Sequence, residues 1–349
     1  MKILAIDTSC DETAVAVTEN NWVISNAISS QIEIHKKWGG VVPGIARRMH
    51  EENIDFVIKE ALSRAKVSLP EIDVFAVTYG PGLAIALEVG IAKIKSFAKE
   101  YGKPLVAVNH MEGHLYSTLA HNSKGNPKIE YSFPLIALLV SGGHTEIILM
   151  KDHGVYEVLG RTIDDAVGEA FDKVARMLEL GYPGGPILEQ MAKKGDENKF
   201  PLPIPMSKDK SLNMSYSGLK TAVLYLVQKV VKNDLTPKEK STLVCDIAAS
   251  FQKAAVEEIL IKTKSALEKM SQDYPVKDIL LGGGVSANSY LRKKLRATFG
   301  KKYRLHFPTN KKLYGDNGAM IAVAAYHNAQ RGNFVQDVDA LERNPNLSL

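Results

Sequence analysis

A pattern that occurs twice constrains the fold of this chain more than any other feature. In each copy an apolar run of strand length leads through a short polar turn into a second apolar run. The first copy covers residues 3–17, with its turn at 8–13, and the second covers residues 134–150, with its turn at 141–145. Strand, polar turn and strand is the pattern of a β-hairpin. We therefore expect an internal duplication, in which two lobes each begin on a hairpin whose turn faces a ligand.

The rest of the chain alternates between strand patterns and helical periodicity. Helical periodicity covers residues 44–66, 83–100, 110–120, 164–180 and 240–270, and buried-strand patterns cover 74–78, 105–108 and 278–281. This alternation indicates a layered α/β fold. The polar stretch 122–130 separates the two hairpin copies, so we predict lobes at 1–130 and 131–315. We expect residues 195–220 to be exposed.

Composition places the chain among ordinary globular proteins. Of its 349 residues, 45% are hydrophobic and 24% are charged, which is enough apolar mass for two cores. No leader-like segment precedes the first strand pattern and no apolar run is long enough for a bilayer, so we expect a cytoplasmic protein without membrane association. Cys10 and Cys245 are too few for a secreted disulfide framework, and reduced thiols are expected.

The formal net charge is +5, and the basic residues gather in short runs. These runs are Arg47-Arg48, Arg292-Lys293-Lys294 with Arg296, Lys301-Lys302 with Arg304, and Lys311-Lys312. Each run alone is typical of a solvated helix face, whereas several in one chain also fit a polyanionic partner. Charge does not distinguish RNA, DNA and a nucleotide as that partner.

Three glycine-bearing turns follow strand patterns, at residues 80–82, 141–143 and 282–284. Glycine permits positive φ and close backbone approach, so successive N–H groups can point at phosphate oxygens. A tight turn explains any one of them equally well, but three at separate strand ends favour a phosphorylated ligand. Neither a Walker A loop nor the dinucleotide-binding glycine fingerprint is present.

The sharpest local motif is His110-Met111-Glu112-Gly113-His114. Histidines four residues apart lie on one helical face, so both imidazoles can reach one cation, and imidazole suits zinc, iron, nickel or copper. Glu112 lies roughly opposite that face, which deprives a metalloprotease interpretation of its general base. A third ligand must come from elsewhere. Asp316, before a helix of small residues, is either that ligand or simply the N-cap of the helix.

An acid-rich segment runs from Asp164 to Lys173. If the whole segment is helical, Asp172 falls near the same face as Asp164. The two carboxylates then indicate either a solvated helix face or a site for a ribose or an amine.

In this order along the chain, the motifs resemble those of the bacterial TsaD family. The matching segments are residues 6–13, 39–43, 110–114, 141–145, 164–173, 182–186, 217–221, 283–288 and 316–322. These proteins are tRNA threonylcarbamoyladenosine transferases with a two-lobed actin/Hsp70-like (ASKHA) fold. The resemblance therefore implies an α/β fold of two duplicated ribonuclease-H-like lobes, with the C-terminal segment 316–349 joined to the first lobe.

The resemblance also implies a reaction and a site. A threonylcarbamoyl group passes from threonylcarbamoyl-AMP to the exocyclic amine of the adenosine just 3′ of the anticodon, in tRNAs that read codons beginning with adenine. A divalent metal, usually iron in this family and alternatively zinc, sits on His110, His114 and Asp316. The ligand, with its AMP moiety or ATP, is held by Leu139, Val140, Ser141, Gly142, Gly143, Asp172, Gly185, Glu189 and Asn288.

The reaction needs an acceptor for the proton that leaves the attacking amine. Asp11 and Glu12, in the first hairpin turn, are our candidates, and positioning of the metal or the tRNA is the alternative role for them. Bacterial relatives work with a paralogous actin-like partner (TsaB-like) and a small ATPase (TsaE-like), so these partners are expected beside tRNA.

The chain departs from the family pattern at two places. Gly44 stands where the family usually has an acid, and Tyr314-Gly315 replaces the usual Cys-Thr before the Asp316 motif. Three other functions compete with the transferase: a zinc endopeptidase, a non-catalytic actin-like scaffold for tRNA modification, and a carbohydrate or acetate kinase of the same fold.

Overall fold

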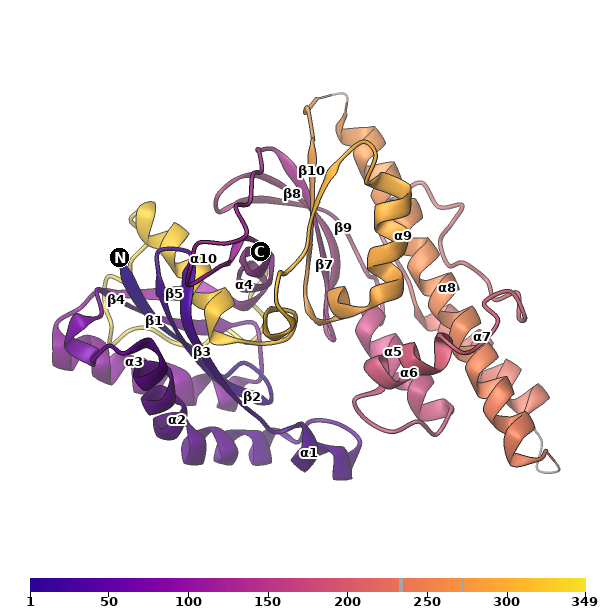
Figure 1. Cartoon of the computed structure of the whole chain (residues 1–349), viewed down its shortest axis with the longest axis horizontal. Coiled ribbons are helices and arrows are strands. Elements are labelled where there is room, and N and C mark those ends of the chain that lie inside the picture. The colour runs from indigo at the N-terminus through magenta and orange to yellow at the C-terminus, as the bar shows by residue number, and fades with distance from the viewer. Residues whose placement is uncertain (232–234, 272) are drawn as a thin grey trace.

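The computed structural model describes residues 1–231, 235–271 and 273–349. The chain forms two mixed β-sheets that lie side by side, with helices packed around each (Figure 1). The first sheet has the order β5-β4-β1-β2-β3-β6 and the second has the order β11-β10-β7-β8-β9.

The first sheet and its helices come mainly from the first third of the chain. The strands are β1 Lys2–Asp7, β2 Glu12–Glu19, β3 Trp22–Ser30, β4 Val74–Gly80, β5 Leu105–Asn109 and β6 His121–Asn122. The helices are α1 Ile32–His35, α2 Pro43–Ala65, α3 Ala84–Tyr101 and α4 His110–Tyr116, with 3₁₀ turns Lys36–Trp38, Leu69–Glu71 and Ser117–Leu119. From the end of the chain, α10 Gly318–Gln330 also packs on this sheet.

The second sheet uses the middle of the chain. Its strands are β7 Leu135–Val140, β8 Thr145–Asp152, β9 Val155–Arg161, β10 Asp278–Gly282 and β11 Arg304–His306. The helices are α5 Val167–Met177, α6 Gly184–Ala192, α7 Ser217–Val230, α8 Pro237–Met270 and α9 Ser289–Phe299, with 3₁₀ turns Gly284–Ala287 and Lys311–Leu313.

Five strands of each sheet share one topology, and β6, parallel to β3, extends the first sheet only. β1, β2 and β3 form an antiparallel meander, with β4 parallel to β1 and β5 parallel to β4. In the second sheet β7, β8 and β9 form the same meander, with β10 parallel to β7 and β11 parallel to β10. The duplication expected from the repeated hairpin is therefore confirmed.

A continuous apolar core joins the sheets through α10. The first residues of α10 are glycine, alanine and other apolar residues that are fully buried, and a Cβ on Gly318 would lie 2.5 Å from the backbone N of Ala16. The same buried cluster includes Ala5 of β1 and Leu139 of β7. Because each fully buried large apolar side chain contributes about 1.5–3 kcal/mol, this shared core holds the residues just before α10 in a fixed place. The division at residue 130 stays a prediction.

Two sequence predictions about local structure are wrong. The helix expected over 164–180 begins only at Val167, so Asp164 lies before it. The segment 195–220 is not exposed throughout, because Leu212, Met214 and Tyr216 are buried and α7 begins at Ser217. The reason is a long-range contact: the buried Lys262 amine of α8 donates to the carbonyls of Asp209 and Ser211, at 2.9 and 2.7 Å.

Within the described residues, no helix combines the length and the apolar character that a membrane crossing needs. Cys10 and Cys245 are free cysteines.

Candidate metal centre and ligand cavity

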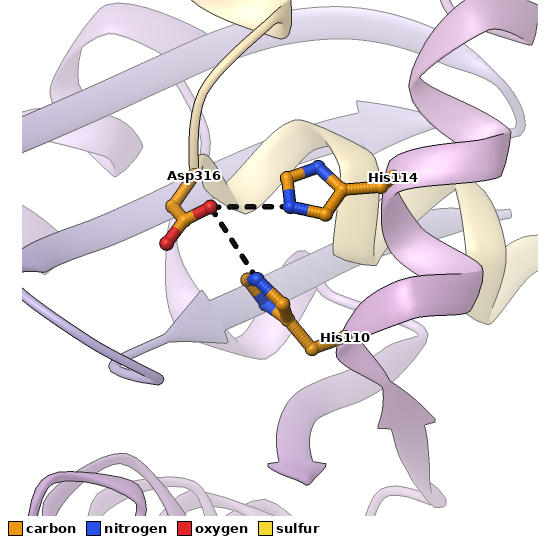
Figure 2. Close-up of side chains that lie close together, drawn as sticks. All are labelled: His110, His114 and Asp316. Atoms are coloured by element: carbon orange, nitrogen blue, oxygen red, sulfur yellow. Dashed lines mark ion pairs between the residues drawn. The ribbon is translucent and has the colours of Figure 1, made fainter. Parts of the chain in front are cut away.

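Two histidines of α4 and an aspartate ahead of α10 converge on one point (Figure 2). Helix α4 begins at His110 because the Asn109 side chain accepts the Met111 backbone N–H at 2.8 Å, which caps the helix. One turn of helix then brings His110 Nε2 and His114 Nε2 each to 3.3 Å from Asp316 Oδ1. One ligand atom from each residue lies within 4.8 Å of the other two.

Attraction between carboxylates and histidines offsets the cost of burying the charged groups of this cluster. Burial alone would lower the pKa of His110, but attraction by Asp316 and Asp7 outweighs it and raises the pKa to about 10. Burial would likewise raise the pKa of Asp316, yet the two histidines hold the pKa of that carboxyl far below its usual range. The cluster is therefore an anionic carboxylate facing two imidazoles.

Asp7 is a residue of this site that the sequence analysis did not assign. It ends β1, is fully buried, and its Oδ2 lies 3.3 Å from Nδ1 of His110. A carboxylate on the second nitrogen of a ligating histidine fixes the orientation of the ring in known metal sites. Its only sequence signal was an acid at the end of an apolar strand pattern.

The donor set fits a divalent transition metal. Two imidazoles and a carboxylate suit zinc or iron. Within the described part of the chain, Asp7 Oδ2 and Nδ1 of both His110 and His114 are buried without a hydrogen-bond partner, which is costly unless another group satisfies the cluster.

Glu112, between the two histidines, points away from them. Its carboxylate accepts hydrogen bonds from the Tyr156 hydroxyl at 2.7 Å and the Asn328 amide at 2.9 Å. It therefore ties α4 to β9 and α10. A metalloprotease of the His-Glu-x-x-His kind would need this acid at the metal, so the geometry gives the endopeptidase alternative no base.

The two candidate proton acceptors lie in the first hairpin turn, beside Asp316. Asp11 is buried, and Ser30 Oγ donates to Glu12 Oε1 at 3.1 Å. Burial raises the pKa of Glu12, and the neighbouring charges of Asp316 and Asp11 raise it further. This acid turn and the metal cluster form one electrostatic unit.

A cavity of about 330 Å³ opens between the second sheet's helices and α1 of the first lobe. It is lined by five of the predicted ligand-binding residues, Gly142, Asp172, Gly185, Glu189 and Asn288. The structure thus brings together residues that are far apart in the chain.

The polar residues of this cavity also hold helix N-termini. Asp172 Oδ1 accepts the N–H groups of Gly184 and Gly185 at 2.8 and 3.0 Å, and burial raises its pKa. Asn288 caps α9 by accepting the N–H of Leu291 at 3.0 Å. Glu189 accepts the N–H of Ser289, also at 3.0 Å. These bonds rigidly shape the walls of the cavity.

Leu139, Val140 and Ser141 are buried, and the first two side chains belong to the core. The side chains of Leu139 and Val140 therefore do not face a ligand, and the two residues pair with neighbouring strands. Gly142 and Gly143 are exposed, and a Cβ on either would meet no atom within 4 Å.

The turn 141–144 links the cavity to the metal cluster. Gly142 lines the cavity, while burial and the charges of His110 and His114 lower the pKa of His144 to about 4. A ligand that fills the cavity and reaches past this turn would therefore approach the cluster.

The glycine turn at 80–82 packs against the C-terminal segment, and Gly82 also lines a second cavity, of about 510 Å³, with Gly143 and His144, so its role toward a ligand stays a prediction. Gly82 N–H donates to the carbonyl of Pro345 at 3.2 Å, and a Cβ on Gly80 would lie 1.9 Å from the carbonyl oxygen of Asn344. The C-terminal segment covers this turn. In the third turn, Gly282 and Gly283 pack against the backbone of His114 and Val140, and only Gly284 lines the cavity.

Asp164 and Asp172 do not share a helical face, because α5 begins after Asp164. The Asp164 carboxylate instead accepts the N–H groups of Tyr216 and Ser217 at 2.8 and 3.3 Å. Asp164 therefore holds the start of α7, and of the two acids only Asp172 lines the cavity.

Known proteins show both the fold and the family. HypF of T. kodakarensis is similar in structure, with a TM-score of 0.62 and 16% identity over 97% of this chain and 49% of HypF. Component A of (R)-2-hydroxyglutaryl-CoA dehydratase from Acidaminococcus fermentans gives a TM-score of 0.53 at 13% identity, covering 95% of this chain and 99% of that chain. These likenesses confirm the predicted actin/Hsp70-like fold.

The fold and the His-His-Asp cluster together define a two-lobed actin-like protein with a site able to hold a metal ion. The sequence matches the family model of TsaD, described as tRNA N6-adenosine threonylcarbamoyltransferase, over residues 22–323. The proteins so named from Thermosipho africanus (strain TCF52B) and Dictyoglomus turgidum (strain DSM 6724 / Z-1310) are 50% and 46% identical, covering 100% of this chain and 100% and 99% of theirs. The chain belongs to the TsaD family of transferases.

Proposed function

We propose that this protein transfers the threonylcarbamoyl group of threonylcarbamoyl-AMP to the exocyclic amine of the adenosine 3′ of the anticodon, in tRNAs that read codons beginning with adenine. The observation that carries the proposal is the continuity of the site. The turn 141–144 has Gly142 in the cavity and His144 within electrostatic reach of His110 and His114. The cavity beside Gly142 suits a nucleotide, and the metal cluster near His144 suits a reacting acyl group.

The AMP part of the donor occupies the cavity lined by Asp172, Gly185, Glu189 and Asn288. In the part of the chain that the structure describes, no acceptor bonds the N–H groups of Gly142 and Gly143. They are candidates for the phosphate oxygens, because the turn is open and carries no acid. His110, His114 and Asp316 hold the divalent metal, iron or zinc. When bound, that metal supplies Lewis-acid stabilisation of negative charge on a carbonyl or phosphate oxygen.

The reaction balances without a covalent enzyme intermediate. The amine nitrogen attacks the carbamoyl carbon, an N–C bond forms, the C–O bond to the phosphate breaks, and AMP leaves. The amine loses one proton, which Glu12 or Asp11 accepts. The raised pKa of Glu12 favours this role, because a base works best when its pKa approaches the working pH.

Two partners belong to the proposal through the family: a paralogous actin-like protein and a small ATPase. The scaffold alternative predicts that this chain binds nucleotide and partners without needing its histidines.

The test is reconstitution of transfer. Purified protein, threonylcarbamoyl-AMP and unmodified tRNA are combined with and without the partners, and nucleosides are analysed for threonylcarbamoyladenosine. We expect product that depends on added metal and disappears in the His110→Ala, His114→Ala double variant. Full product from that variant would refute the catalytic metal and favour the scaffold.

A further inference from the structure

A groove of about 640 Å³ lies where α9, strand β11 and the segment 127–130 meet. Two residues of its lining lie close in the chain to residues of the metal cluster. Thr118, in its lining, follows His114 by one turn in the 3₁₀ continuation of α4. Tyr314, also in its lining, precedes Asp316 by two residues.

The groove and its rim are positively charged. Lys128 and Arg296 line it, Arg292 stacks on the lining residue Tyr314, and within the described ranges no ion pair joins any of the three to a carboxylate. Glu130 is the acid of the lining, and its charge acts on Arg304. Lys128 and the basic run of α9, which are far apart in the sequence, therefore meet on one surface.

Aromatic rings lie beneath two of these cations. The Arg296 guanidinium lies 4.6 Å from the ring centroid of Phe307, and that of Arg292 lies 5.0 Å from the ring centroid of Tyr314. Guanidinium planes held over aromatic rings are platforms on which unpaired bases stack. Cations beside such platforms are typical of grooves that bind single-stranded nucleic acid.

We propose that this groove binds the single-stranded nucleotides of the tRNA anticodon loop that neighbour the target adenosine. The cations take the phosphates, and the rings with their guanidinium planes take the bases. A double-stranded stem does not suit the groove, because paired bases are not free to stack. The identity of the RNA rests on the proposed function, whereas the preference for unpaired RNA rests on the groove itself.

The test uses a synthetic anticodon stem-loop RNA and a duplex of the same stem without the loop, each titrated into the full chain by fluorescence anisotropy. The double variant Lys128→Ala, Arg296→Ala should weaken loop binding about tenfold and lower the slope of log affinity against log salt by about 1.4, since each phosphate contact to a single strand contributes about 0.7. Lys301→Ala with Lys302→Ala is the matched control. It removes two cations outside the groove and should leave affinity unchanged.

A second variant tests the stacking platform. Arg296→Lys keeps the charge and loses the planar group, so it should weaken loop binding less than the double variant does but still measurably. Binding equal to that of the unaltered protein would overturn the stacking part of the proposal.

The readouts separate this proposal from the reaction. Unchanged loop affinity in the double variant would overturn the groove, even if transfer proceeds. Suppose that the unaltered protein binds the loop through these residues but forms no threonylcarbamoyladenosine. The proposed transfer reaction would then be refuted, and the proposal that the groove binds unpaired RNA would stand. Unchanged RNA affinity with lost activation by added partner proteins would assign the groove to a protein, and would also overturn the proposal.

Discussion

The turn between β1 and β2 and the turn between β7 and β8 occupy the same position in the five-strand topology that the two sheets share. The first is flanked and filled by acids: Asp7, Asp11 and Glu12. The second, residues 141–144, has serine, two open glycines and a histidine with a lowered pKa.

The difference shows how a duplicated fold can provide a cation site from one copy and a phosphate site from the other. Asp316 and then Asp7, which precedes the first turn, raise the pKa of His110 against the effect of burial, in the cluster that a cation would complete. An equally acidic second turn would repel a phosphate, so a neutral turn with free N–H groups is what a nucleotide needs. Both turns therefore lie within electrostatic reach of the cluster of His110, His114 and Asp316.

The largest expected effect comes from the carboxylate that faces both histidines. We expect Asp316→Asn to remove most bound metal and to lower single-turnover transfer by about 10²–10³, because a neutral amide neither balances the two imidazoles nor supports the charge that develops in the reaction. Metal analysis and nucleoside analysis measure the two effects. Asp55→Asn, which neutralises a carboxylate that is 76% exposed on α2, is the control. Full metal content and full transfer in Asp316→Asn would show that Asp316 is not needed to hold a metal, and the proposed metal site would be refuted.

The next effect distinguishes acids within the first turn. Asp7→Asn should weaken metal affinity about tenfold to a hundredfold, as loss of a partner behind a ligating histidine does elsewhere. Competition with a chelator measures it. Glu12→Gln is the matched comparison: it should keep the metal and slow transfer. If Asp7→Asn binds metal normally and Glu12→Gln loses it, the roles assigned to these two acids are reversed.

The sequence predicted features that depend on local spacing. The repeated hairpin required only alternating apolar and polar runs, and the His110–His114 pair required only helical periodicity. Spacing alone left Asp316 open between N-cap and ligand. The resemblance favoured the ligand role, and the structure shows that Asn317, not Asp316, caps α10.

Features that depend on distant contacts were missed. Asp7 meets His110 because the sheet order places β1 and β5 on either side of β4, which no local pattern records. Gly80 and Gly82 resembled a phosphate turn, and only the fold shows that Asn344 and Pro345 cover them. Asp164 was assigned to a helix that begins three residues later, because a helix start is set by packing as much as by periodicity.

A smaller effect tests the second turn. A Cβ on Gly142 would meet no atom within 4 Å, and Gly142 lines the cavity, so Gly142→Val should raise KM for threonylcarbamoyl-AMP about tenfold with little change in kcat. Stability should change by less than about 0.5 kcal/mol in urea unfolding. Gly218→Val, at an equally open glycine of α7, is the control. An unchanged KM would mean that the donor does not reach the turn 141–144.

The smallest effect concerns His144, the titratable side chain of the second turn. Its folded pKa of about 4 lies below the usual 6.5, so the unfolded chain binds a proton at a higher pH than the folded chain does. At pH 7 His144 is neutral in both states and does not change the free energy of unfolding. As pH falls from about 6.5 to about 4 the free energy of unfolding decreases, and below that the decrease is constant. His144→Asn should therefore lose less stability than the unaltered chain between pH 7 and pH 6, by no more than about 1 kcal/mol, in urea unfolding of chelator-treated protein. Parallel losses in both proteins would mean that the charges of His110 and His114 do not reach the second turn, and that the two turns act independently.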